Sequence, residues 1–93
     1  MEIIWSKKSQ QALNIIYEYL SVEKEVLAKE IISCIINTVK IKIYNYKHIG
    51  RAGRILGTRE FVLSQYPYII IYTIKNNYLY IVNILHTSMK YPK

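Results

Sequence analysis

The sequence predicts a two-layer α+β domain in which a short strand and a two-helix hairpin precede a three-stranded antiparallel meander, in the order β-α-α-β-β-β. Two observations support this fold class. Apolar residues recur at helical spacing up to Ile43, whereas β-branched and aromatic residues alternate at strand spacing after Pro67. The length of 93 residues is typical of one domain, so we expect residues 1–93 to form a single unit.

The first elements are predicted by a short apolar run and a capping residue. Glu2–Trp5 is expected to form a strand, and Ser6 offers the side-chain oxygen of a helix N-cap. Apolar residues then follow at helical spacing in the first predicted helix: Ala12, Leu13, Ile16, Tyr17 and Leu20.

A second helix is expected directly after the first. Ser21 is a further N-cap candidate, and Glu23 and Glu25 would lie in a first turn, where carboxylates interact favourably with the helix dipole. One apolar stripe continues along this helix and consists of Ala28, Ile32, Ile35, Ile36, Val39 and Ile43. Because the connection at Leu20–Val22 is short, the two helices should form a hairpin.

The pattern changes after Tyr44. Gly50, Gly53 and Gly57 interrupt the chain within a short distance, so this stretch is predicted to be a loop. Thr58–Leu63 is then predicted to be the first strand of the meander.

Two longer strands complete the predicted meander. Tyr68–Lys75 and Tyr78–His86 are joined by Asn76–Asn77, a pair that tolerates the positive φ angles of a tight hairpin turn. In the first of these strands, Tyr68, Ile70, Tyr72 and Ile74 would lie on one face and Ile69, Ile71 and Thr73 on the other. Both faces are apolar, so we expect the helices to cover one face and something else to cover the other.

Positive charge is concentrated in the middle of the chain. The net charge is +7, and residues 31–59 contain no acidic residue. The basic residues of this stretch are Lys40, Lys42, Lys47, Arg51, Arg54 and Arg59. Such a block favours an anionic partner, either nucleic acid or an acidic polypeptide. The alternative is a solvated lysine-rich loop.

Several classes of protein are disfavoured by the composition. Cys34 is the only cysteine, which excludes an intrachain disulfide and fits a reducing compartment such as the cytoplasm. The longest uncharged runs have 14 residues, too few to span a bilayer, and no signal peptide is recognisable. Two scattered histidines and one cysteine argue against a metal site. No phosphate-binding loop is present, so no cofactor is expected.

Two motifs in the second half resemble the RelE/ParE family of toxins from bacterial type II toxin–antitoxin systems. Gly50–Phe61 is similar to the family's glycine–arginine loop and the strand that follows it. Pro67–Tyr72 and the ending Ile84–Pro92 are similar to its last two strands, and Trp5-Ser6 also matches. The resemblance covers nearly the whole chain. It implies a growth-arresting toxin that a cognate acidic antitoxin protein wraps and masks.

The resemblance leaves two targets open. RelE-like toxins cut mRNA on the ribosome, whereas ParE-like toxins poison DNA gyrase. Glu60, Val62 and Ile69 stand where RelE-like toxins carry basic residues, and Met89 replaces a common arginine. The resemblance therefore favours gyrase inhibition over ribosome-dependent mRNA cleavage and leaves open whether the protein is an enzyme. A third possibility is a degenerate member that serves as a structural or antitoxin-titrating module.

Two residues are candidates for catalysis if the chain is an endoribonuclease. His86, at the end of the last strand, would transfer the proton of the ribose 2′-hydroxyl. Arg59 would stabilise the charge that develops on the phosphate. The structural alternatives are a histidine bonded to backbone and an arginine bonded to loop carbonyls or to carboxylates.

Five further residues are candidates for binding the target or nucleic acid. Arg51 and Arg54 lie among glycines, which allow backbone to approach a partner closely. A tyrosine can stack on a base, although packing within the sheet is the alternative for it. The set consists of Lys47, Arg51, Arg54, Tyr68 and Lys90.

Overall fold

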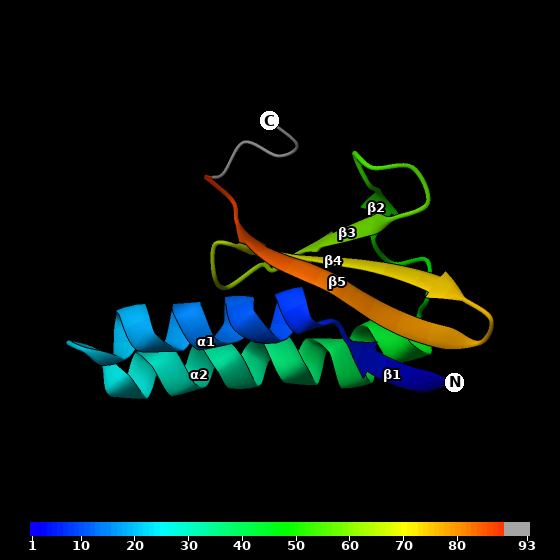
Figure 1. Cartoon of the computed structure of the whole chain (residues 1–93). Helices are drawn as coiled ribbons and strands as arrows, with labels where there is room; N and C mark the ends of the chain where they lie inside the picture. The colour runs from blue at the N-terminus through cyan, green and yellow to red at the C-terminus, as the bar shows by residue number, and fades with distance from the viewer. Residues whose placement is uncertain (89–93) are drawn as a thin grey trace.

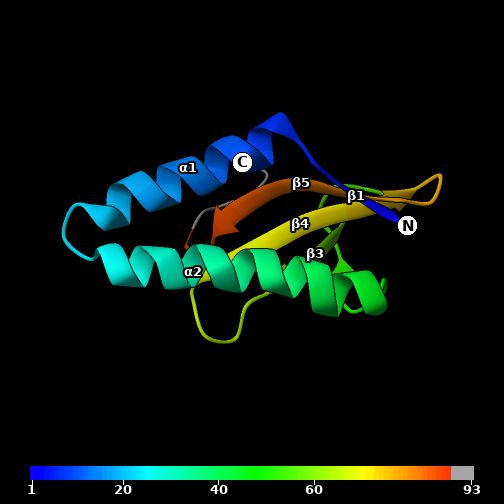
Figure 2. The same ribbon diagram turned by 90° about the horizontal axis from the view of Figure 1, so that it is seen from below.

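The computed structural model describes residues 1–88 and has two layers, with both helices on one face of a sheet (Figure 1). The helices are α1 (Lys7–Ser21) and α2 (Glu25–Asn37), and α2 continues into the π-helical segment η1 (Thr38–Ile43). The strands are β1 (Glu2–Trp5), β2 (Arg51–Ala52), β3 (Arg59–Val62), β4 (Tyr68–Lys75) and β5 (Tyr78–His86). Figure 2, seen from the helix side, shows the two helices side by side in front of the sheet. Within residues 1–88, no helix is long and apolar enough to cross a membrane.

The sheet has five strands in the order β1-β5-β4-β3-β2. The predicted antiparallel meander is present as β3, β4 and β5, and β1 pairs with β5 in parallel. The prediction of a loop between residue 45 and β3 is wrong at Arg51 and Ala52, which form β2 and pair with Glu60 and Arg59. Two residues leave no periodicity to detect, so only the pairing defines this strand.

Ser6 is the N-cap of α1, as predicted. Its Oγ accepts the backbone N–H of Ser9 at 3.0 Å and donates to the carbonyl of Val82 at 2.8 Å, which joins the start of α1 to β5. The prediction for Ser21 is wrong. Ser21 is the last residue of α1, its hydroxyl donates to the Glu18 carbonyl at 3.4 Å, and Lys24 is the N-cap of α2.

The apolar stripe of α2 forms much of the core. Ile35, Val39 and Ile43 are fully buried, as is Ala28, while Ile31 is also buried and was not in the predicted stripe. Residues four apart drift around an α-helix of about 3.6 residues per turn. The wider turns of η1 keep Val39 and Ile43 on the same side as Ile35, so the helix continues to face the sheet.

The tight turn between β4 and β5 agrees with the prediction. Asn76 and Asn77 have φ values of 53° and 63°, the left-handed conformation that a two-residue hairpin turn requires. The turn fixes the start of the β4–β5 register, in which Lys75 lies opposite Tyr78.

A bulge in β5 changes which residues face the helices. Ile71 lies opposite Asn83 and Tyr72 lies opposite Ile81, so Val82 has no partner in β4. Leu79 and Ile81 face the core before the bulge, and the even-numbered Ile84 faces it afterwards. The bulge therefore places His86, opposite Tyr68, on the side of the helices.

The second face of the sheet is not an exposed apolar surface. Ile69, Ile71 and Leu85 form a separate cluster there, and each is less than a tenth exposed within the chain itself. Covering this face therefore does not require a second protein.

Candidate functional site

The glycine–arginine loop is organised around the buried carboxylate of Glu60, which is 3% exposed. Its Oε1 accepts from the Arg51 guanidinium at 3.2 Å, and its Oε2 accepts the backbone N–H of Arg54 at 3.0 Å. The Nε of Arg54 lies 3.5 Å from Oε2. Burial alone would raise the pKa of Glu60, but the bonds from Arg54 and Arg51 and their positive charges outweigh it and lower the pKa below its ordinary value.

Arg59 points to the opposite side of β3 from Glu60 and binds backbone. Its Nη1 donates to the carbonyl of Gly50 at 2.8 Å and to that of His48 at 3.4 Å. This is the contact to loop carbonyls that the sequence offered as the alternative to catalysis. Arg59 thus holds the chain that leads into β2.

The hydroxyl of Tyr72 supports the same segment from β4. It accepts the backbone N–H of Gly50 at 2.9 Å and donates to the Lys47 carbonyl at 2.8 Å. Burial raises the pKa of Tyr72, so its hydroxyl stays protonated and can donate. The contacts of Tyr72, Arg59 and Glu60 hold the segment 47–54 against β3 and β4. Four of the predicted basic residues therefore lie at one edge of the sheet: Lys47, Arg51, Arg54 and Arg59.

His86 and Tyr68 lie at the other end of the β4–β5 pair. Their rings meet edge to face with centroids 5.3 Å apart. The Nδ1 of His86 accepts the backbone N–H of Ser88 at 3.1 Å and lies 2.8 Å from the Ser88 hydroxyl. Tyr68 is 8% exposed, and burial raises its pKa. Its ring packs within the sheet, which was the alternative to stacking on a base.

The two catalytic candidates do not converge. Arg59 lies opposite Tyr72 and His86 lies opposite Tyr68, so the two are offset by four positions of β4, or roughly 13 Å along the strand. Lys90, the remaining candidate, lies outside the described residues, as does Met89. Within residues 1–88, no cluster of histidine, cysteine or acidic side chains could hold a metal ion.

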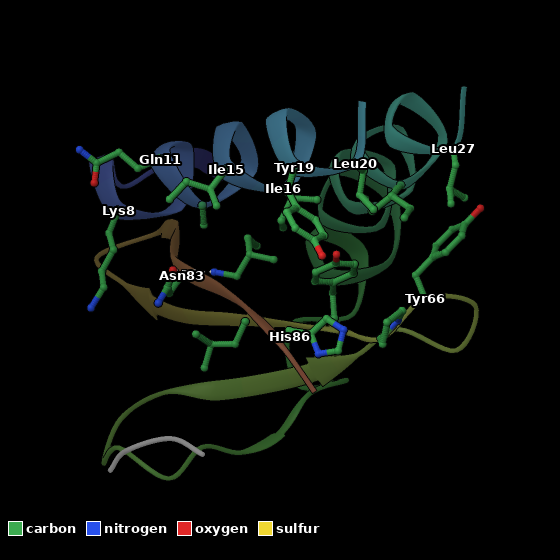
Figure 3. A pocket seen from close by; sticks show the side chains of 16 residues that line it. Lys8, Gln11, Ile15, Ile16, Tyr19, Leu20, Leu27, Tyr66, Asn83 and His86 are labelled. Atoms are coloured by element: carbon green, nitrogen blue, oxygen red, sulfur yellow. Dashed lines mark hydrogen bonds between the residues drawn. The ribbon is translucent and has the colours of Figure 1, made fainter. Parts of the chain in front are cut away.

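A groove of about 700 Å³ separates α1 from the ends of β4 and β5 (Figure 3). Ile15, Tyr19 and Leu20 reach it from α1, and His86 lies on its far side. Ile15 is 64% exposed and Tyr19 81%, although both are large and mainly apolar. Sequence reasoning missed this groove. The sequence signal for it is an apolar face on α1 that is wider than the core needs. Ile15 and Tyr19, four residues apart, lie beside the partly buried stripe of this helix.

Comparisons with known proteins agree with this architecture. The family described as "ParE toxin of type II toxin-antitoxin system, parDE" matches residues 3–91. The protein Y4kP of Sinorhizobium fredii (strain NBRC 101917 / NGR234) is 31% identical over 91 residues, which are 98% of this chain and 93% of the relative. A solved structure of a chromosomal ParDE system from P. aeruginosa has the same fold, with a TM-score of 0.86 and 22% identity over 95% of this chain and 97% of that one. The chain therefore belongs to the ParE toxin family of type II toxin–antitoxin systems.

Proposed function

We propose that this ParE-type toxin arrests growth by binding DNA gyrase and that a cognate acidic antitoxin holds it inactive. The observation that carries the proposal is that the arginines of the toxin bind groups within the chain itself. Glu60 binds Arg51 and Arg54, and Arg59 binds the carbonyls of Gly50 and His48. These contacts fix the backbone and the arginine side chains of the glycine–arginine loop, which supports a role for this loop in binding a partner.

Catalysis of RNA cleavage would need a different arrangement. A base must reach the 2′-hydroxyl while cations surround the neighbouring phosphate. His86 and Arg59 are roughly 13 Å apart along β4, too far to act on one phosphate. Glu60 and Ile69, at positions where RelE-like toxins carry basic residues, are buried. The geometry therefore favours binding of a target over cleavage of mRNA.

The groove beside α1 supports an antitoxin as a second partner. An amphipathic helix could bury the exposed side chains of Ile15 and Tyr19 there, and acidic residues on its polar face would meet Lys8 at the rim. The similar structure from P. aeruginosa is of a ParDE system, which agrees with such a pairing. The antitoxin is expected to be acidic because this chain carries a net charge of +7.

Two measurements test the proposed target. Expression without the antitoxin should halt growth, with DNA-damage signalling ahead of any loss of translation. The purified toxin should inhibit supercoiling by purified DNA gyrase, and addition of the antitoxin should relieve this inhibition. Cuts in mRNA at ribosome-spaced positions within minutes of induction, with gyrase unaffected, would overturn the proposal.

A further inference from the structure

The loop between β2 and β3 presents apolar side chains to solvent at its tip. Leu56 is 100% exposed and Ile55 is 42% exposed, and the two are adjacent in the chain. In Figure 1 this loop projects on the side of the sheet away from the helices. A large apolar side chain wholly in water gains nothing for the fold, which makes it a candidate for contact with another molecule.

The loop is held in one conformation by its own hydrogen bonds. The Gly53 N–H donates to the Thr58 carbonyl at 2.7 Å, and the Thr58 hydroxyl and N–H both donate to the Ile55 carbonyl, at 2.6 and 3.1 Å. The Thr73 hydroxyl donates to the Gly57 carbonyl at 2.7 Å, which ties the loop to β4. Leu56 is thus presented on a rigid support, so little conformational entropy is lost when a partner binds.

Glycine is required at both ends of this tip. Gly57 has a φ of +86°, a conformation that other residues rarely adopt. At Gly53, a Cβ would lie 2.9 Å from the carbonyl oxygen of Thr58, too close for the loop to close. The sequence around Leu56 therefore specifies this conformation.

The base of this loop carries two partly exposed arginines. Arg51 and Arg54 both contact Glu60, yet their side chains remain 60% and 38% exposed to solvent, respectively. Glu60 is the only acidic residue after residue 30, and it is buried. The exposed charges of residues 51–60, the stretch that contains Leu56, are therefore all positive.

We propose that Leu56 inserts into an apolar pocket on the toxin's target protein, and that carboxylates at the rim of that pocket face Arg51 and Arg54. The inference rests on the proposed function in that it takes the partner to be the target of the toxin. An apolar tip in the same loop as two guanidinium groups that Glu60 orients is consistent with the dry centre and polar rim of a protein interface. Bare duplex DNA offers phosphates to the arginines but no pocket for Leu56, so a protein is the better match.

The tip and the groove can be occupied independently. The groove is lined by residues of α1, α2, 66–68 and 83–86, and by none from the loop. The strand β2, which leads into the loop, forms the edge of the sheet opposite β1. A change at Leu56 should therefore alter contact with the target and leave binding of an antitoxin in the groove intact.

The experiment compares three variants. Leu56→Asp places a charge at the tip, and Leu56→Met keeps an apolar side chain of similar volume. Val22→Asp replaces a different aliphatic side chain, which is 82% exposed, with the same charged residue. Each variant is assayed for thermal melting, growth arrest on induction, binding to purified DNA gyrase and co-purification with the antitoxin.

We expect Leu56→Asp to melt like the unaltered protein, to co-purify with the antitoxin, to bind gyrase about tenfold or more weakly and to lose growth arrest. Leu56→Met and Val22→Asp should still bind gyrase and still arrest growth. The inference is overturned if Leu56→Asp still arrests growth fully, or if it loses the antitoxin while it keeps growth arrest. It is also overturned if the toxin binds bare duplex DNA and Leu56→Asp weakens that binding equally.

The proposed function and this inference fail in different ways. If the unaltered toxin arrests growth without binding gyrase, gyrase is not the target and the proposed function is wrong. In that case growth arrest by the three variants still decides whether Leu56 contacts the target, because this readout requires no knowledge of the target.

Discussion

The phenol of Tyr72 and the backbone of Gly50 meet in a contact that leaves no space for a side chain. The Gly50 N–H donates to the Tyr72 hydroxyl at 2.9 Å, and a Cβ on Gly50 would lie 2.9 Å from that oxygen. The same hydroxyl donates to the Lys47 carbonyl. One side chain of β4 therefore fixes the segment that leads into the glycine–arginine loop.

Tyr72→Phe should destabilise the protein. The change removes a hydroxyl that pairs with the Gly50 N–H and the Lys47 carbonyl, and leaving the buried Gly50 N–H unpaired costs about 1–3 kcal/mol. Urea denaturation measures the difference. Tyr78→Phe, at an exposed tyrosine, is the control and should have little effect. Equal stability of the two variants would show that the Tyr72 hydroxyl contributes little.

Glu60→Gln should change how stability depends on pH. The pKa of Glu60 is lower in the folded protein than its ordinary value of 4.5, so its ionised form stabilises the fold above that pH. This contribution is lost as the pH falls through the lowered pKa. The variant should be less stable than the parent at pH 7, and the gap should narrow in acid.

Denaturation of the Glu60→Gln variant from pH 7 down to pH 2 measures this gap. Glu30→Gln, at an exposed glutamate on α2, is the matched control. A gap that stays constant at every pH would contradict the assigned role of the Glu60 charge.

Ile15→Asp should weaken binding of the antitoxin without unfolding the toxin. Ile15 is 64% exposed and lines the groove, so a charge there is solvated in the free protein and desolvated in the complex. We expect the antitoxin to dissociate at least about ten times faster, measured by surface plasmon resonance. Tyr46→Asp, at a residue 67% exposed outside the groove, should leave the rate unchanged. If Tyr46→Asp had the larger effect, the antitoxin would bind elsewhere.

His86→Ala should leave gyrase inhibition and growth arrest largely intact. In the proposed mode of action no proton is transferred, and His86 contacts only Tyr68 and Ser88 among the interactions found in residues 1–88. Growth assays and supercoiling assays measure the outcome. If growth arrest were lost while melting stayed normal, His86 would belong to the working surface and the endonuclease alternative would gain support.

Ile35→Ala should cost on the order of 2–5 kcal/mol of stability, because truncation of a buried isoleucine loses apolar contacts and leaves a cavity. Ile35 is 0% exposed in the centre of the core. Ile32, which is partly exposed on the same helix, provides the matched control, and Ile32→Ala should cost less. Calorimetric melting measures the stability of the two variants. If Ile32→Ala destabilised the protein more than Ile35→Ala, the assignment of the core would be wrong.

The local rules predicted most elements of the fold because their signals lie within a few residues. Ser6 precedes an apolar helical stripe, and Asn76–Asn77 separates two alternating segments, so both features are readable from the sequence. The N-cap prediction for Ser21 failed because a serine between two helices can either end the first helix or cap the second. Its hydroxyl instead bonds within α1.

The arrangement of the site depends on contacts that the sequence does not encode locally. The arginines at 51 and 54 are recognisable as basic loop residues, but only the β2–β3 pairing places them on Glu60. The separation of Arg59 from His86 likewise follows from the register of three strands. Net charge predicted an anionic partner without revealing that part of this charge is neutralised internally.

The unpaired Val82 also affects how relatives should be aligned. The bulge compensates for this extra residue, so the side chains before and after Val82 keep the faces that the pairing with β4 gives them. A homologue without the extra residue would form a regular strand with the same side chains on each face. Aligning such a homologue without a one-residue gap beside Val82 would equate side chains on opposite faces of the sheet, because a shift of one residue exchanges the two faces.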